Sequence, residues 1–105
     1  MQPLTSFQAK YLRGAAHGLK PVVFVGQKGI TPSLLNSIQE ALNAHELIKV
    51  KFVDFKDRRM KAERAAEIER QTGGCMAGLI GHTAIFYRPN PDREKRKIVI
   101  PAKRA

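Results

Sequence analysis

The sequence has little cysteine, no long hydrophobic run and few acidic residues, and each shortage excludes a class of protein. Cys75 is the single cysteine, which rules out a disulfide framework and a cysteine-based zinc site and is typical of a reducing compartment. The longest hydrophobic runs, residues 21–25 and 84–87, are far shorter than the ~20 residues that a membrane span requires. The first residues also lack the charged and then apolar pattern of a signal peptide. We therefore expect a soluble, cytoplasmic protein.

Acidic residues are outnumbered by basic ones. The 105 residues include 9 Asp and Glu against 19 Lys and Arg, which gives a formal net charge of +10. With 43% hydrophobic residues the chain is too apolar for a disordered polyelectrolyte and has the length of one domain. A domain this basic repels itself, and the usual partner of such a domain is a polyanion, above all nucleic acid. The composition thus predicts a nucleic-acid partner, with an acidic membrane surface as the weaker candidate.

Hydrophobic periodicity, capping residues and turn residues divide the chain into helices and strands. Three segments have apolar residues at helical spacing after a capping residue, which predicts helices over residues 5–17, 31–45 and 57–71. Four segments are rich in β-branched residues or alternate in polarity, which predicts strands over residues 22–25, 47–53, 75–80 and 83–88. The last two strands are expected to form a hairpin that turns at Gly81-His82.

The resulting order, α-β-α-β-α-β-β, predicts an α/β fold. The first strand, helix and second strand should form a right-handed crossover with parallel strands. Residues 22–25 are all apolar, so this strand is expected to be buried on both faces. In the second strand Lys49 and Lys51 alternate with apolar residues, which predicts one covered face and one wet, basic face. We therefore expect a two-layer sandwich, a four-stranded mixed sheet with the helices packed against it.

The composition changes after Pro89. Residues 90–105 contain six Lys and Arg, and few of them are apolar. We interpret residues 1–89 as the folded domain and residues 90–105 as a mostly flexible basic tail. The apolar residues 98–100 leave room for a short edge strand over residues 97–100.

A glycine-bracketed loop, Gly26-Gln27-Lys28-Gly29, lies between the first strand and the second helix. The two glycines allow a tight turn and a close approach of a ligand, and a helix start offers unpaired N–H groups and a positive dipole end. Lys28 adds a full charge. The loop is similar to the GxxG loop with which KH domains hold a nucleic-acid backbone, although a KH loop joins two helices. The competing interpretation is a plain turn that needs glycine for its dihedral angles.

Further basic residues form weaker candidates. Lys49 and Lys51 could make an electropositive stripe on the open face of the sheet. Four cations lie at the start of the third helix, where they oppose the helix dipole: Arg58, Arg59, Lys61 and Arg64. They indicate either a ligand or a surface network of ion pairs with neighbouring acidic residues. Tyr87 and Arg88 could stack on a base and pair with a phosphate, although Tyr87 could equally cap the core.

The sequence contains no recognisable active site, metal site or cofactor-binding motif. The three histidines, His17, His45 and His82, are scattered and suit turn or capping roles. No spaced carboxylate pair, Walker loop or dinucleotide fingerprint is present. Cys75 is expected to be a small buried residue. We therefore predict a protein that is not an enzyme and takes no cofactor, metal or small-molecule substrate.

Eight short motifs occur in an order that resembles a known family. They are Leu12-Arg13, Ala16-His17, Leu19–Val23, Val25–Thr31, His45–Lys51, Thr72–Gly74 with Ile80-Gly81, and Tyr87–Pro89. Together they resemble the CRM domain (chloroplast RNA splicing and ribosome maturation), in particular its bacterial single-domain YhbY-like members, over about residues 5–89. Many relatives have a lysine directly after the first glycine of the loop, where Gln27 stands in this chain.

The resemblance implies a fold like the C-terminal domain of translation initiation factor three, binding of ribosomal RNA, and association with precursors of the large ribosomal subunit. It implies that the loop residues Gly26, Gln27, Lys28 and Gly29 hold RNA phosphates. The surrounding positive surface would come from Arg13, Lys20, Lys49, Lys51 and Arg88. A general DNA-binding or nucleoid protein is the alternative, because charge alone fits both. Nothing in the sequence demands an oligomer, so we expect a monomer.

Overall fold

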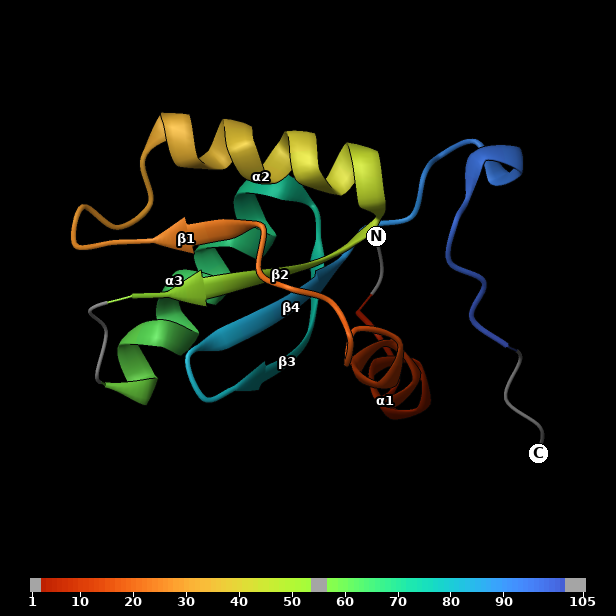
Figure 1. The fold of residues 1–105 in the computed structure, drawn as a ribbon, viewed down its shortest axis with the longest axis horizontal. Helices are drawn as coiled ribbons and strands as arrows, with labels where there is room; N and C mark the ends of the chain where they lie inside the picture. The colour runs from red at the N-terminus through yellow and green to blue at the C-terminus, as the bar shows by residue number, and fades with distance from the viewer. Residues whose placement is uncertain (1–2, 54–56, 102–105) are drawn as a thin grey trace.

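The structure is a computed structural model that describes residues 3–53 and 57–101, and its elements follow the predicted order (Figure 1). They are α1 (Ser6–Ala15), β1 (Val23–Val25), α2 (Pro32–His45), β2 (Leu47–Phe52), α3 (Arg58–Thr72), β3 (Cys75–Ile80), β4 (Thr83–Tyr87) and a short 3-10 helix, η1 (Arg93–Lys95). The predicted α/β fold of three helices and a four-stranded mixed sheet is confirmed. None of the described helices is long and apolar enough to cross a membrane.

The sheet has the strand order β1-β2-β4-β3. β1 is parallel to β2, as the crossover predicts, whereas β4 is antiparallel to both β2 and β3. The hairpin between β3 and β4 turns at Gly81-His82, and Gly81 adopts a φ of 59° there. That left-handed conformation favours glycine, because other residues meet a steric penalty in it. The hairpin was therefore predictable from its turn residues.

The helix starts also follow the sequence. Thr5 caps α1 in a reciprocal pair with Gln8, Thr31 accepts a hydrogen bond from Leu34 N at 3.1 Å, and Asp57 caps α3. Gly73 ends α3 at a φ of 75°. The end of α1 differs from the prediction, because the regular helix stops at Ala15 and the chain turns before it reaches Gly18.

The two faces of the sheet are covered unequally. α2 and α3 pack on one face over the larger core, whose buried residues are Val23, Val25, Ile38, Leu42, Ile48, Val50, Phe52, Ala65, Ile68, Ala84 and Phe86. α1 packs on the opposite face over a smaller cluster, whose buried residues are Leu12, Ala16, Leu47, Ala77, Ile85 and Tyr87. The two-layer arrangement thus holds for α2 and α3, and α1 adds a partial third layer. Because α1 is short, the β1 side of this opposite face, here called the open face, stays uncovered (Figure 1).

The prediction that residues 22–25 are buried on both faces is wrong. Val23 and Val25 are buried under α2, whereas Val22 and Phe24 are 49% and 55% exposed. β1 is an edge strand, and α1 packs on the same sheet face but on the side away from β1. An apolar run predicts a buried strand, but it does not show whether a helix covers the second face.

The segment after Pro89 packs back onto the domain. Residues 97–100 form no strand, so the predicted edge strand is absent. Ile98 and Ile100 instead pack against the cluster under α1. The N–H groups of Lys97 and Ile98 donate to the carboxylate of Glu46, and these donors are therefore not available for a strand ladder.

Candidate nucleic-acid interface

The loop of residues 26–29 is a tight turn at one end of the sheet. Gly29 N donates a hydrogen bond to Gly26 O at 3.0 Å, and Gly29 adopts a φ of 70°, which explains the second glycine. The chain then enters α2 through Thr31 and Pro32. Gln27 and Lys28 are exposed, and no acidic residue lies in the first turn of α2. The loop therefore presents a positive side chain beside a positive helix end.

A shallow hollow joins this loop to the neighbouring strand. Its lining residues come from β1, the loop and the first turn of α2: Phe24, Gly26, Gln27, Lys28, Gly29, Thr31 and Leu34. Behind the loop, Arg64 of α3 lies with its Nε 3.7 Å from the place where a Gly29 Cβ would be. This Nε is buried and has no hydrogen-bond partner among the described residues. The loop thus lies against the buried Nε atom of a half-buried arginine.

A row of three residues crosses the open face next to the loop. Phe24 of β1 is paired in register with Lys51 of β2, and Lys51 with Thr83 of β4. Paired residues of neighbouring strands point to the same face of a sheet. Phe24 and Lys51 are exposed, so an aromatic ring and an ammonium group lie side by side on this surface.

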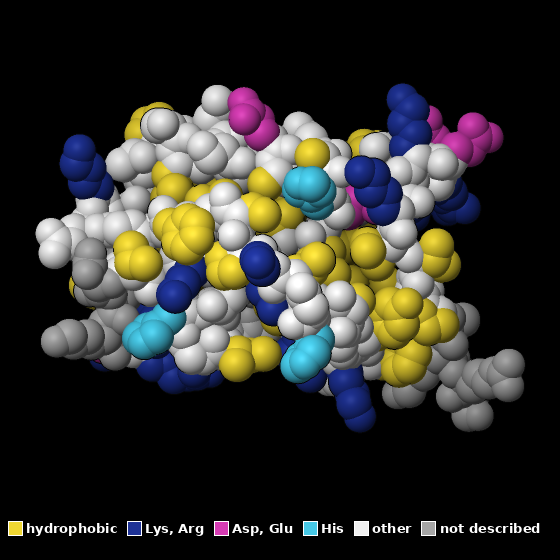
Figure 2. Space-filling model, in the orientation of Figure 1, with side chains coloured by type: hydrophobic (Ala, Val, Ile, Leu, Met, Phe, Trp, Pro, Cys, Tyr) yellow, Lys and Arg dark blue, Asp and Glu magenta, His cyan; other side chains and the backbone are white. Residues whose placement is uncertain are grey.

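The open face carries no negative charge of its own. No acidic residue precedes Glu40, and none occurs within the four strands. On the face shown in Figure 2, acidic side chains gather along the upper edge, over α2 and the C-terminal segment, whereas Lys, Arg and His side chains are spread across the centre. Among the described residues, the strands therefore place no acidic side chain on this face to offset Lys28 and Lys51.

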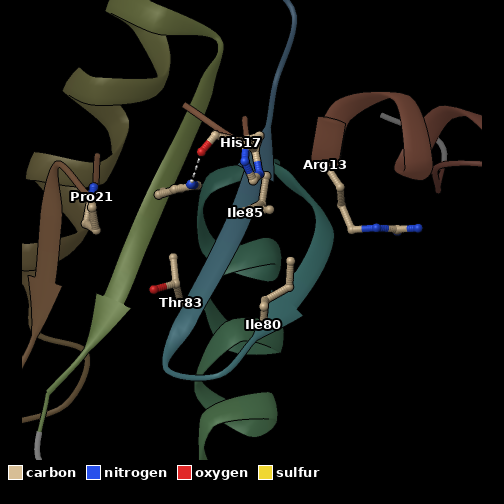
Figure 3. Close-up of a pocket in the computed structure, with 7 residues that line it drawn as sticks. Arg13, His17, Pro21, Ile80, Thr83 and Ile85 are labelled. Carbon is tan, nitrogen blue, oxygen red and sulfur yellow. Dashed lines mark hydrogen bonds between the residues drawn. The ribbon is translucent and has the colours of Figure 1, made fainter. Parts of the chain in front are cut away.

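A groove of about 320 Å³ runs between α1 and the open face (Figure 3). It is lined by Arg13, His17, Pro21, Lys49, Ile80, Thr83 and Ile85. Lys49 Nζ donates to His17 O at 3.3 Å, and Arg13 Nη1 donates to Ala77 O at 2.9 Å. Arg13 crosses β3 at Gly78, and a Cβ there would lie 2.7 Å from Arg13 Cδ, so that the Arg13 side chain would have to shift. The structure thus brings Arg13 and Lys49 together in one groove, with part of their hydrogen-bonding capacity already used.

The other two predicted surface cations lie away from the loop. Lys20 is exposed at the opposite end of β1, beside an apolar hollow lined by Leu19 and Val22. Arg88 is turned toward α2 and α3. Its Nη1 donates to Gln39 Oε1 and, at 2.6 Å, to Thr72 O, while its Nη2 donates to Asn43 Oδ1 at 2.6 Å and to Gln39 O at 3.4 Å.

Burial lowers the pKa of Arg88 from its ordinary value. A guanidinium with these four contacts joins α2 to the end of α3. It has little capacity left for a phosphate. A role for Arg88 in RNA binding stays a prediction that its surroundings do not favour.

The cations Arg58, Arg59 and Lys61 of α3 contact either the β3–β4 hairpin or an acidic residue of the same helix. Lys61 is buried, with Nζ 2.9 Å from Gly81 O and 3.3 Å from His82 Nδ1. Arg58 Nη2 donates to Leu79 O at 3.3 Å. Arg59 and Glu63 form an exposed ion pair at 3.5 Å. Lys61 and Arg58 therefore hold α3 against β3 and its turn.

Tyr87 is 4% exposed, so the suggestion that it stacks on a base is wrong and it caps the core instead. Burial raises the pKa of its hydroxyl, and the charge of Glu46 adds to that effect. The same cluster contains Leu47 and Ile85. Among the described residues, Tyr11 of α1 and Phe24 of β1 are the exposed aromatic side chains, and sequence reasoning had placed Phe24 in the core.

Sequence reasoning also missed Glu46. This residue is 2% exposed and has a φ of 63°, the one positive φ of a non-glycine residue among the described residues. Its carboxylate accepts hydrogen bonds from Asn90 N at 2.6 Å, from Lys97 N and from Ile98 N at 3.0 Å. Burial alone would raise the pKa of Glu46, but these N–H donors and the charge of Arg96 outweigh it, so the pKa lies below its ordinary value.

Within residues 3–53 and 57–101, no three His, Cys, Asp or Glu side chains are grouped so that they could hold a metal ion. Cys75 is buried, as predicted, and burial raises the pKa of its thiol. The candidate surfaces for a nucleic acid are the loop, the open face and the groove beside α1.

The family model of the CRS1/YhbY (CRM) domain matches residues 4–88. The chain is 43% identical over 103 residues to the "RNA-binding protein" of Haemophilus influenzae, a match that covers 98% of this chain and 100% of that relative. It is 33% identical to the "Probable RNA-binding protein YqeI" of Bacillus subtilis, over 93% of this chain and 99% of the relative. It also resembles a solved structure, that of a hypothetical protein of Staphylococcus aureus described as a candidate RNA-binding protein. The TM-score is 0.71 and the identity 32%, over 93% of this chain and 99% of the other.

Proposed function

The chain belongs to the CRS1/YhbY (CRM) domain family, and we propose that it is an RNA-binding protein of the cytoplasm that associates with precursors of the large ribosomal subunit and assists ribosome assembly. In this proposal the protein is not an enzyme. The observation that carries the RNA-binding part is the loop of residues 26–29, where exposed Lys28 and the start of α2 adjoin a strand surface without acidic residues. The relatives support it, because they are named for RNA binding.

The loop would bind a backbone phosphate. Backbone N–H groups at the start of α2 and the Lys28 ammonium are donors of the kind that phosphate oxygens accept. Lys51 lies on the open face beside the loop, and Arg13 and Lys49 lie in the groove farther along this face. An RNA strand that crossed the open face would meet these cations in succession. Such contacts position the backbone and carry no direct sequence information.

The role in assembly requires more than attraction to phosphate. Mature ribosomal subunits expose phosphates everywhere, so a general binder of this charge would spread over all ribosomal fractions. An assembly factor must prefer an RNA conformation that maturation later covers or rearranges. The loop and the open face adjoin through Phe24 and Lys51, so both could grip one such site.

A sucrose-gradient profile of cells with and without the protein tests this role. We expect the protein to sediment with large-subunit precursors and to be depleted from translating ribosomes. Its loss should raise the share of immature large subunits and of unprocessed large-subunit RNA. Equal abundance on small subunits, or an unchanged profile with a uniform distribution, would contradict the assembly role and leave general RNA binding.

A competition assay separates RNA binding from the alternative of general DNA binding. Structured ribosomal RNA and duplex DNA would compete for the protein at one fixed salt concentration, because affinities for nucleic acids are comparable only at equal salt. We expect ribosomal RNA to displace DNA. Equal displacement by both would favour a general basic nucleic-acid binder.

A further inference from the structure

Phe24 is a large apolar residue on a sheet face that is exposed to solvent. The side chain is 55% exposed on the open face, whereas Phe52 and Phe86 are 1% and 0% exposed in the core. A large aromatic ring on a solvent-facing edge strand gains little from folding, because it stays in contact with water. What singles out Phe24 among the exposed apolar side chains is that its ring also lines the hollow of the loop.

The surroundings of Phe24 define the chemistry of that ligand. The ring lines the same hollow as Gly26, Lys28 and Gly29. Exposed Lys51 is its register partner on β2. An aromatic ring between a phosphate-binding loop and a cation matches how proteins bind single-stranded nucleic acid, where bases stack on aromatic side chains while cations follow the backbone.

We propose that Phe24 is the stacking platform for one unpaired RNA base, whose adjoining phosphate lies at the loop of residues 26–29. The proposal rests on the RNA binding proposed above and adds the class of RNA, an unpaired nucleotide in a single strand, loop or bulge. In a double helix the faces of the bases are covered by their neighbours, so a paired nucleotide has no face to offer Phe24. Every base has such a face, so the contact tolerates any sequence.

The chain offers a matched control variant and allows a fluorescent reporter to be introduced. Val22 is 49% exposed and precedes β1, but it lines a different hollow from the loop. Val22→Ala therefore removes exposed apolar surface of the same edge without touching the site. The sequence contains no tryptophan, so Phe24→Trp introduces a single fluorescent indole at the proposed stacking position.

The experiment measures the affinity of each full-length variant for a mixed-sequence single-stranded RNA and for the same strand annealed to its complement, at one salt concentration. Stacking on an aromatic side chain contributes enough that Phe24→Ala should weaken binding of the single strand about fivefold or more. Binding of the duplex should change much less, and Val22→Ala should change neither. The fluorescence of Phe24→Trp should be quenched by the single strand and not by the duplex.

The outcomes separate this proposal from the one on which it rests. If Phe24→Ala binds the single strand as tightly as Val22→Ala does, while Lys28→Glu binds it weakly, then stacking on Phe24 is refuted and RNA binding through the loop stands. If neither Phe24→Ala nor Lys28→Glu weakens binding, both proposals are refuted. Equal losses on single strand and duplex would show that Phe24 supports the loop instead of stacking, which also overturns the inference.

Discussion

Two regions of the molecule, the β1–α2 loop with its neighbouring strand and the junction of α2, β4 and the C-terminal segment, differ in whether charged side chains such as Lys28 and Arg88 have partners inside the protein. At the end with the loop, the side chains of Lys28 and Lys51 have no hydrogen bond or ion pair within the part of the chain that the structure describes. At the other end, the Arg88 guanidinium makes four hydrogen bonds and the Glu46 carboxylate accepts three. Figure 1 places the β1–α2 loop and the C-terminal segment at opposite sides of the molecule.

This difference shows which charges serve the fold and which are available for a partner. A charge that is bonded inside the protein stabilises the fold, and removing it leaves its partners unsatisfied. A charge without a protein partner contributes little to stability but acts on any polyanion that approaches. Net charge alone cannot separate these two groups, because Arg88 and Lys28 count equally in it.

The largest expected effect is a loss of stability when Arg88, whose guanidinium has partners inside the protein, is replaced. Arg88→Ala removes the guanidinium that donates to Gln39 Oε1, Thr72 O and Asn43 Oδ1. The loss of several charge-assisted hydrogen bonds should lower the free energy of unfolding by about 2–4 kcal/mol. Urea denaturation measures this loss. RNA affinity per folded molecule should stay the same. A stable Arg88→Ala protein that binds RNA weakly would mean that Arg88 belongs to the interface after all.

The second effect is a loss of RNA affinity when Lys28 in the loop is replaced. Lys28→Glu reverses an exposed charge next to the proposed phosphate, so RNA affinity should fall about tenfold or more, which corresponds to about 1.4 kcal/mol. The free energy of unfolding should change by no more than about 0.5 kcal/mol. Lys10→Glu on the exposed surface of α1 makes the same change in net charge and is the control. Equal losses in both variants would show that only total charge matters.

A third effect is the pH dependence of the stability that Glu46 contributes. The pKa of Glu46 in the folded protein lies below its ordinary value, so the unfolded chain binds a proton first as the pH falls. The stability that Glu46 contributes is therefore fully present above its ordinary pKa and is lost as the pH falls through the lower, folded value. Glu46→Gln should be less stable near neutral pH and should lack this part of the acid dependence. Chemical denaturation from neutral to acidic pH measures both, and parallel curves for the two proteins would contradict the assignment.

The last comparison, in which the expected difference between the two variants is smallest, concerns the two glycines of the loop. Gly29→Ala places a Cβ at a φ of 70°, which should cost about 1–2 kcal/mol of stability, although the added atom would meet nothing closer than 3.7 Å. Gly26→Ala meets nothing closer than 4.0 Å, and Gly26 has no positive φ. We expect it to change the thermal midpoint far less. Equal shifts would mean that the backbone of Gly29 is not restrained.

Local sequence signals predicted the elements and the hairpin, because caps and turn residues such as Thr31, Asp57 and Gly81 act on their immediate neighbours. The exposure of Phe24 was not predictable in this way, since it depends on how far α1 reaches across the sheet. The partners of Arg88 are also distant in sequence: Gln39 is 49 residues away. The docking of residues 97–98 onto Glu46 has the same cause, because a carboxylate can satisfy donors from any part of the chain that the fold brings near.

The salt dependence of RNA affinity tests most directly whether the free cations at the loop end bind phosphates. For single-stranded RNA each neutralised phosphate adds about 0.7 to the slope of log affinity against log salt, so the parent protein should give a slope of roughly −3 to −6. Lys28→Ala should make this slope shallower by about 0.7, whereas Lys10→Ala should leave it unchanged. A slope near zero for the parent protein, or equal slopes for the parent and Lys28→Ala, would contradict the account.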